Sequence, residues 1–329
     1  MIAATPVARW TWGHENSQPE EKVAACLREL LIAWSVAAKH ELVVGIPSIS
    51  LSIHEAGKSN SYLFRGNLEL DASLRSPNLA KGLARRVEAS LSPGVIGSVY
   101  ANAKVANMVS SSRTSSHEEG LVQLGASAVL DYVGVDIVTY SDVWMPFDLK
   151  GRAQPTIHAA NAPRLSVALQ DLSEALRSET DPDDPTRFGK PTESGVDNYR
   201  DRDGSASDVW SSFEIPYRYS KFTQTPGFGR IGYRRSAEGA VQYVPVRGKK
   251  GTLGYLWASD AEKAASFEPL DVGDDEVYVS GLTWLDRLRS AYDRGLSPSE
   301  ALAELASLSE DHKANTLDLS SLRELANSD

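Results

Sequence analysis

The chain has 329 residues, of which 41% are hydrophobic and 24% are charged, and its formal net charge is −10. Single cores rarely grow beyond about 250–300 residues, so this length predicts two domains, or one large one, with a sizeable core. The one cysteine, Cys26, excludes an internal disulfide and multi-cysteine zinc sites. No run reaches the roughly 18–20 apolar residues that span a bilayer, and residues 1–14 lack the features of a signal peptide. We therefore expect a soluble, cytoplasmic protein. The alanine-rich composition, with arginine preferred to lysine, suggests a GC-rich bacterial source.

The first elements alternate between helix and strand patterns. Residues 19–40 predict a helix, with a proline and two glutamates at its start and apolar residues at helical spacing. Residues 42–53 alternate apolar and polar positions, which predicts a half-buried strand, and residues 62–70 are its expected antiparallel partner. A second amphipathic helix is expected over residues 77–91, and a strand over residues 95–109.

The next elements complete a first domain. Residues 121–132 fit a helix or a strand, and we expect a helix. Residues 134–145, rich in Val, Ile, Thr and Tyr, predict a strand, and leucines at helical spacing predict a helix over residues 162–177. Residues 1–177 are therefore expected to form an α+β domain with a mainly antiparallel sheet. Residues 178–208, rich in Asp, Pro, Gly, Ser and Thr, predict an acidic linker or exposed loop.

A second, smaller domain is expected over residues 209–329. Residues 228–257 predict a three-stranded β-meander with turns rich in glycine. A helical hairpin is expected to follow over residues 281–294 and 297–308, and its second helix opens with the capping-box pattern of Ser297 and Glu300. Residues 319–327 predict a short last helix. The predicted fold class is α+β, with a sheet-and-helix domain followed by a meander and a helical hairpin.

Charge is strongly segregated along the chain. Residues 217–250 carry eight bases and one acid, whereas residues 178–208 carry nine acids and four bases and residues 251–329 carry sixteen acids and six bases. Such a pattern pairs with itself or binds a charged partner. Arginines beside a tyrosine suit phosphate and carboxylate groups. The candidate binding residues of the basic meander are therefore Arg230, Tyr233, Arg234, Arg235, Lys249 and Lys250.

No motif fixes a reaction. The glycines from Gly227 to Gly232 match a dinucleotide-loop spacing, but the flanking sequence predicts no strand before them and no helix after them. The six histidines show no metal-ligand spacing, so we expect no metal and no cofactor. The weak catalytic candidates are His117, which precedes two glutamates, and Asp142 and Asp148, which flank a Trp-Met-Pro-Phe run after a predicted strand.

Three functions remain open at this point. The expected one is a module that recognises a macromolecular partner, most simply another protein, through its segregated charge, as an inhibitor or immunity-type protein would. The first alternative is a hydrolase-like enzyme with a dispersed acid/base site in the N-terminal domain. The second is local nucleic-acid binding by the basic meander. Binding to a membrane is not expected.

Overall fold

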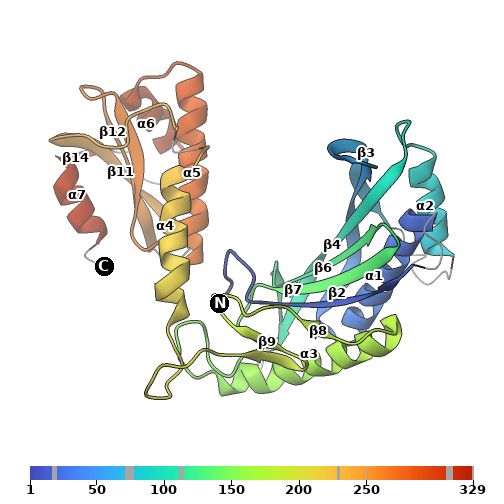
Figure 1. Ribbon diagram of the computed structural model, residues 1–329. Coiled ribbons are helices and arrows are strands. Elements are labelled where there is room, and N and C mark those ends of the chain that lie inside the picture. The colour runs from blue at the N-terminus through green and yellow to red at the C-terminus, as the bar shows by residue number, and fades with distance from the viewer. Residues whose placement is uncertain are drawn as a thin grey trace. The chain divides into compact units, whose positions relative to one another are not determined.

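A computed structural model of the chain describes residues 1–16, 21–70, 78–110, 115–227, 230–249, 251–308 and 314–327, with the backbone alone at residues 59, 105–110 and 115–119. The chain divides into two compact units, Met1–Trp210 and Ser211–Asp329. Each unit has its own sheet and its own helices (Figure 1). This arrangement confirms the predicted α+β class.

The first unit is built on an eight-stranded sheet in which all described pairings are antiparallel. Its strands are β1 (Ala8–Glu15), β2 (Val43–Glu55), β3 (Lys58–Glu69), β4 (Ile96–Ser110), β5 (Ser115–Glu119), β6 (Val122–Val129), β7 (Tyr132–Thr139) and β8 (Asp181–Pro182). The strand order is β3-β2-β4-β6-β7-β1-β8, and β5 pairs with β4. Three helices accompany the sheet: α1 (Lys22–Lys39), α2 (Leu79–Glu88) and α3 (Pro155–Leu176).

Alternation along the strands assigns the two faces of this sheet. One face, which we call the helix-covered face, lies against the helices and buries large apolar side chains, among them Trp10, Trp12, Ile49, Leu51, Ile53, Val99, Leu124 and Ile137. Helix α1 contributes Val23, Leu27 and Leu30 to the same core, and α3 contributes Leu165 and Leu169. The sheet and its helices therefore share one core on one side, as is common for antiparallel sheets.

The segment predicted as a linker or exposed loop belongs to the first unit. Its strand β8 extends the sheet beside β1, and its hairpin of β9 (Lys190–Thr192) and β10 (Gly195–Asp197) contacts β1. The indole nitrogen of Trp10 donates to the Thr192 carbonyl over 2.7 Å, and Phe188 and Val196 are buried. The division between the units falls after Trp210.

The second unit has a four-stranded antiparallel sheet in the order β13-β12-β11-β14. The strands are β11 (Ala240–Gly248), β12 (Gly251–Ser259), β13 (Ala264–Pro269) and β14 (Asn315–Asp318), and the helices are α4 (Ile215–Gln224), α5 (Asp275–Asp293), α6 (Pro298–Ala306) and α7 (Leu319–Ala326). Helices α5 and α6 pack on one face, over Val244, Leu256 and Phe267. Helix α7 packs on the other, over Val241 and Trp257.

Two predicted elements are wrong. Residues 121–132 form strand β6 and a turn rather than a helix, because Leu124, Ala126 and Ala128 alternate with small residues, so their period is two. The meander lies over residues 240–269 instead of 228–257. Of the described residues of its expected first strand, Gly232 has φ +91° and Tyr233 is buried in the core instead of pairing in a ladder. No helix of the described residues combines the length and the apolar character that crossing a bilayer requires.

Candidate functional site

The second face of the eight-stranded sheet is polar, and we call it the open face. Its side chains point away from the helices and are half-buried or exposed. The pairing register of the strands aligns these side chains in rows that run across neighbouring strands. The face comprises Arg65 and Tyr62 on β3, Ser48, Ser50, Ser52 and His54 on β2, Tyr100, Asn102 and Lys104 on β4, Gln123 and Ser127 on β6, Asp136 on β7, and Arg9 and Thr11 on β1.

Aromatic and basic side chains gather at one end of the open face. The ring centroid of His54 lies 4.5 Å from that of Tyr62 and 5.6 Å from that of Tyr100, and Arg65 lies over the Tyr62 ring at 5.3 Å. Tyr62 is 45% exposed and Tyr100 is 41% exposed. Binding hot spots are enriched in tyrosine and arginine side chains such as these, which are exposed and held by a regular β-sheet. We call these four residues the aromatic cluster.

A groove of about 790 Å³ lies at the other end of the sheet. Strand β2 has an irregularity between Val44 and Ser48, where Gly45 takes φ +82° and Ile46 is exposed. Bulges of this kind redirect side chains near sites. The groove is lined by Val44, Ile46, Ser48, Lys104, Gln123 and Tyr140. Its volume is within the usual range of ligand clefts.

Polar groups beside the groove are connected by hydrogen bonds. The Tyr140 hydroxyl donates to Oε1 of Gln123 over 3.1 Å, and the Gln123 amide donates to Oδ1 of Asn102 over 3.4 Å. The Asp136 carboxylate lies over Gly125, where a Cβ would meet it at 2.5 Å. Burial raises the pKa of Asp136, and the guanidinium of Arg9, 3.6 Å away, opposes that shift. Burial and the nearby Asp136 carboxylate also raise the pKa of Tyr140. The open face therefore holds two acids whose charged forms are disfavoured.

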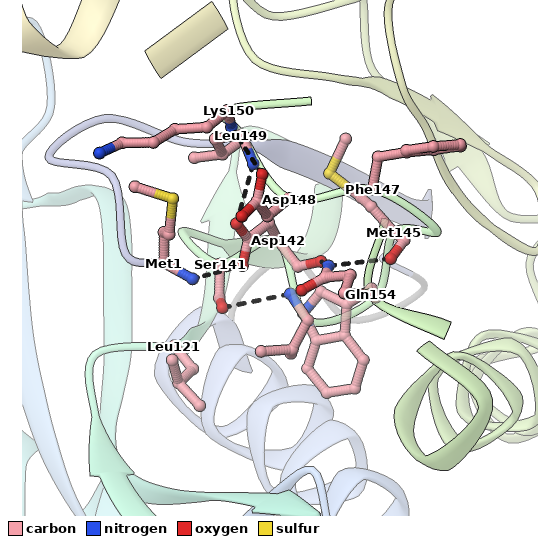
Figure 2. Close-up of polar contacts among 12 residues, drawn as sticks. Met1, Leu121, Ser141, Asp142, Met145, Phe147, Asp148, Leu149, Lys150 and Gln154 are labelled. Atoms are coloured by element: carbon pink, nitrogen blue, oxygen red, sulfur yellow. Dashed lines mark hydrogen bonds and ion pairs between the residues drawn. The ribbon is translucent and has the colours of Figure 1, made fainter. Parts of the chain in front are cut away.

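The predicted candidate Asp142 forms part of a buried turn rather than a cleft (Figure 2). It is 0% exposed; its Oδ2 accepts from the backbone amide of Leu149 over 3.0 Å, and its Oδ1 accepts from the amino group of Met1. Burial raises the pKa of Asp142, and the amino group opposes that rise. Asp148 lies in the same turn and accepts from the amides of Lys150 and Arg152 and from the Arg152 guanidinium. These hydrogen bonds stabilise the turn. They occupy the oxygens of both carboxylates, which are therefore poorly available to a substrate.

His117 is the remaining catalytic candidate, and Cys26 is the one cysteine of the chain. His117 lies on β5, opposite Met108 on β4, and its side chain is outside the described part of the chain. Cys26 is fully buried in α1, and burial raises the pKa of its thiol to about 12, so it is not a nucleophile at neutral pH. Within the described ranges, no three His, Cys, Asp or Glu side chains are placed to bind a metal.

The candidate residues of the basic meander serve several structural roles. Arg235 donates to the carbonyls of Phe222, Thr223 and Thr225 and so caps the carboxyl end of α4. The hydroxyl of Tyr233 donates to the Leu296 carbonyl over 2.7 Å, inside the core. Arg230 is exposed. These residues therefore do not present their side chains as one surface.

Acids from the chain's own C-terminal region pair with the basic segment. Arg234 bonds Glu262 over 2.8 Å, and the buried Arg218 bonds Asp275 over 2.6 Å. Lys249 follows β11 at the far end from Arg234, and the two ends of this nine-residue strand are roughly 25 Å apart at about 3.3 Å per residue. Lys250 lies outside the described residues. Part of the charge segregation seen in the sequence is thus paired within the second unit.

Several residues of the open face were missed from the sequence. Asp136 interrupts an otherwise apolar strand, and this charged position inside a Val- and Ile-rich run was a usable signal. Tyr62, Arg65 and Tyr100 carried no signal of their own, because their grouping depends on the register of three strands.

No protein-family model, no curated protein and no solved structure matches this chain.

Proposed function

We propose that this chain is an interaction protein that recognises another protein through the open face of its eight-stranded sheet. The observation that supports this most directly is the aromatic cluster, in which two exposed tyrosines pack against His54 and an arginine lies over one of them. Interfaces concentrate their binding energy in such tyrosine and arginine side chains. The sheet holds their backbone in place, so little conformational entropy is lost when a partner binds.

Charge has a supporting role in this proposal. Arg9, Arg65 and Lys104 lie on the open face together with Asp136, in a chain of net charge −10. Charges of both signs at fixed positions mainly orient and speed the encounter with a partner. An inhibitor or immunity-type role fits a surface of this kind. We further propose a cytoplasmic location, supported by a single cysteine that is buried and unpaired.

The test compares two variants that remove the same kinds of side chain. Tyr62, Arg65 and Tyr100 are changed to Ser in one, and Tyr219 and Arg230 of the second unit are changed to Ser in the other. Each tagged protein captures partners from lysate of the source cells, and the affinity for a stoichiometric partner is then measured by calorimetry. We expect the open-face variant to bind at least about tenfold more weakly, because truncating a hot spot costs more than 1 kcal/mol.

The control variant should bind like the wild type. Loss of the partner in the control variant alone would move recognition to the second unit. Equal binding by all three proteins would refute recognition through the aromatic cluster. All the altered side chains are exposed, so the free energy of unfolding should change by no more than about 0.5 kcal/mol.

An enzyme is the second candidate, and one observation favours it. Asp136 and Tyr140 both have raised pKa values, Tyr140 lines the groove, and the Asp136 carboxylate is close enough to contribute to the raised pKa of Tyr140; a general acid at such a position would be useful. Hydrolysis of p-nitrophenyl esters and phosphates by the wild type and by Asp136→Asn would test it. Turnover that is lost in the variant would support an acid role for Asp136, and equal turnover in both would refute it.

A further inference from the structure

A second cavity lies on the helix-covered side of the first unit, away from the open face. It has a volume of about 510 Å³ and is bordered by β1, α1 and the end of α3. We call it the Glu29 cavity. The polar residues that line it are His14 from β1, Arg28 and Glu29 from α1, and Arg177, which follows the last residue of α3.

Hydrogen bonds hold the walls of this cavity together. The Ser178 hydroxyl donates to the Gly13 carbonyl over 3.0 Å and accepts from the Gly13 amide over 3.1 Å. One turn earlier, the hydroxyl of Ser173 accepts from the indole of Trp12 over 3.0 Å. Because Gly13 precedes His14 and Ser178 follows Arg177, these bonds fix the two cavity residues beside each other.

Arg177 adopts a backbone conformation that usually favours glycine. Its φ is +54°, and its amide bonds the Ser173 carbonyl to close the last turn of α3. A side chain at such a position strains the backbone. Arg177 borders the cavity, and its guanidinium forms no hydrogen bond or ion pair with any side chain that the structure describes.

Glu29 supplies the opposite charge at the cavity wall. It is only 5% exposed, and its Oε1 accepts from Nε of Arg28 over 3.0 Å, with Nε2 of His14 at 4.0 Å. Its second oxygen, Oε2, has no hydrogen-bond donor among the described residues. Oε2 is not sealed from solvent, so a cationic group of a ligand that enters the cavity can bond it.

We propose that the Glu29 cavity binds a small zwitterion, whose ammonium group bonds Glu29 and whose carboxylate bonds Arg177. Arginine is well suited to a carboxylate because its planar fork makes two parallel hydrogen bonds. A simple anion would contact Arg177 but would leave Oε2 of Glu29 without a donor. The volume accommodates an amino acid or a short peptide and is within the usual range of ligand cavities. This site goes beyond the proposed partner recognition and uses other residues.

Calorimetry with the full chain tests the proposal. The probes are the twenty amino acids, 4-aminobutyrate and the dipeptide Gly-Gly, with acetate and methylammonium as half-ligands. We expect at least one zwitterion to bind at least about tenfold more tightly than either half-ligand, because each charged contact contributes a factor of that order. The series also tests which distance between the ammonium and carboxylate groups the cavity prefers, because α-amino acids, 4-aminobutyrate and the dipeptide differ in that distance.

Three variants complete the experiment. Arg177→Gln and Glu29→Gln should each weaken binding of the zwitterion by about tenfold or more, whereas Arg187→Gln, an exposed arginine of the same unit, should leave binding unchanged. Arg177 is exposed, so its variant keeps the fold even if the Glu29 variant does not. Absence of binding up to about 10 mM ligand, equal binding of acetate, or full binding by Arg177→Gln would each overturn the proposal. Capture of a partner through the aromatic cluster is independent of these results.

Discussion

The two sheets of this chain are covered differently. The four-stranded sheet of the second unit has helices on both faces: α5 and α6 over Leu256 and Phe267, and α7 over Trp257. The eight-stranded sheet of the first unit is helix-covered on one face, and its other face carries serines, asparagine, tyrosines and charged residues. A sheet covered on both faces gains stability, whereas a sheet with one open face retains a surface for recognition.

One ion pair from each unit shows a similar contrast. Arg218 in the second unit is buried and bonds Glu214, Asp275 and the carbonyls of Val272 and Gly273. On the open face, Arg9 is partly exposed and lies 3.6 Å from Asp136. The first arrangement is a fully bonded ion cluster inside a core, and the second is a loose pair that a partner can reach.

The largest effect is expected from breaking the buried cluster. Arg218→Met leaves the Glu214 carboxylate, which is 0% exposed, without its cation. Removing one partner of a buried pair costs about 3–5 kcal/mol. Arg234→Gln breaks the exposed pair with Glu262 and should cost no more than about 1 kcal/mol. Urea unfolding of both variants measures the free energies.

A double variant separates the effect of the unpaired charge on stability from the effect of lost packing. In Arg218→Met/Glu214→Leu no buried charge is left unpaired, because the remaining partner, Asp275, is 61% exposed, so much of the lost stability should return. Equal stability of Arg218→Met and Arg234→Gln would show that the second unit tolerates a buried, unpaired carboxylate.

Local patterns made much of the fold predictable. The capping box of Ser297 and Glu300 forms as expected and begins α6, and the alternating positions of residues 42–53 fall within β2. Strand β1 was missed, although Trp10 and Trp12 alternate with Arg9 and Thr11 over an eight-residue strand. The third helix was predicted to start at residue 162, but α3 begins at Pro155 and continues through Pro163.

The candidate sites depended on contacts that are distant in the sequence. The aromatic cluster joins three strands, and the Glu29 cavity joins residues from β1, α1 and the end of α3. Neither has a local motif, so composition and spacing could not locate them. The basic segment was visible in the sequence, but whether its charges pair internally depends on tertiary contacts such as Arg234 with Glu262.

An intermediate effect is expected from uncovering the second face of the smaller sheet. Leu322 of α7 is 0% exposed and packs with Trp257. Leu322→Ala should lower the free energy of unfolding by about 2–5 kcal/mol through lost burial and a cavity. Asn102→Ala on the open face should change it by no more than about 0.5 kcal/mol. If both variants unfold at the same denaturant concentration, the proposed difference between a covered and an open face fails.

The smallest effect concerns the pH dependence of stability on the open face. Burial raises the pKa of Asp136, so the folded protein holds this proton more tightly than the unfolded chain. The free energy of unfolding therefore falls as the pH rises from the unfolded pKa to the folded one, and the penalty is complete above the folded pKa. Asp136→Asn removes the ionisation, so this variant should gain stability relative to the wild type between pH 3 and pH 7 (the range is set by the usual aspartate pKa of about 3.9).

Glu55, at the end of β2, provides a control of opposite sign. Hydrogen bonds from Lys58 and Ser61 lower its pKa, so its contribution is present above the unfolded pKa and is lost as the pH falls through the folded one. Glu55→Gln should therefore lose stability relative to the wild type as the pH rises over the same range. Urea unfolding of both variants at each pH gives the two slopes. Slopes of the same sign would mean that Asp136 is as well solvated as an ordinary surface carboxylate, and the open face would then lack the partly desolvated acid on which the enzyme alternative rests.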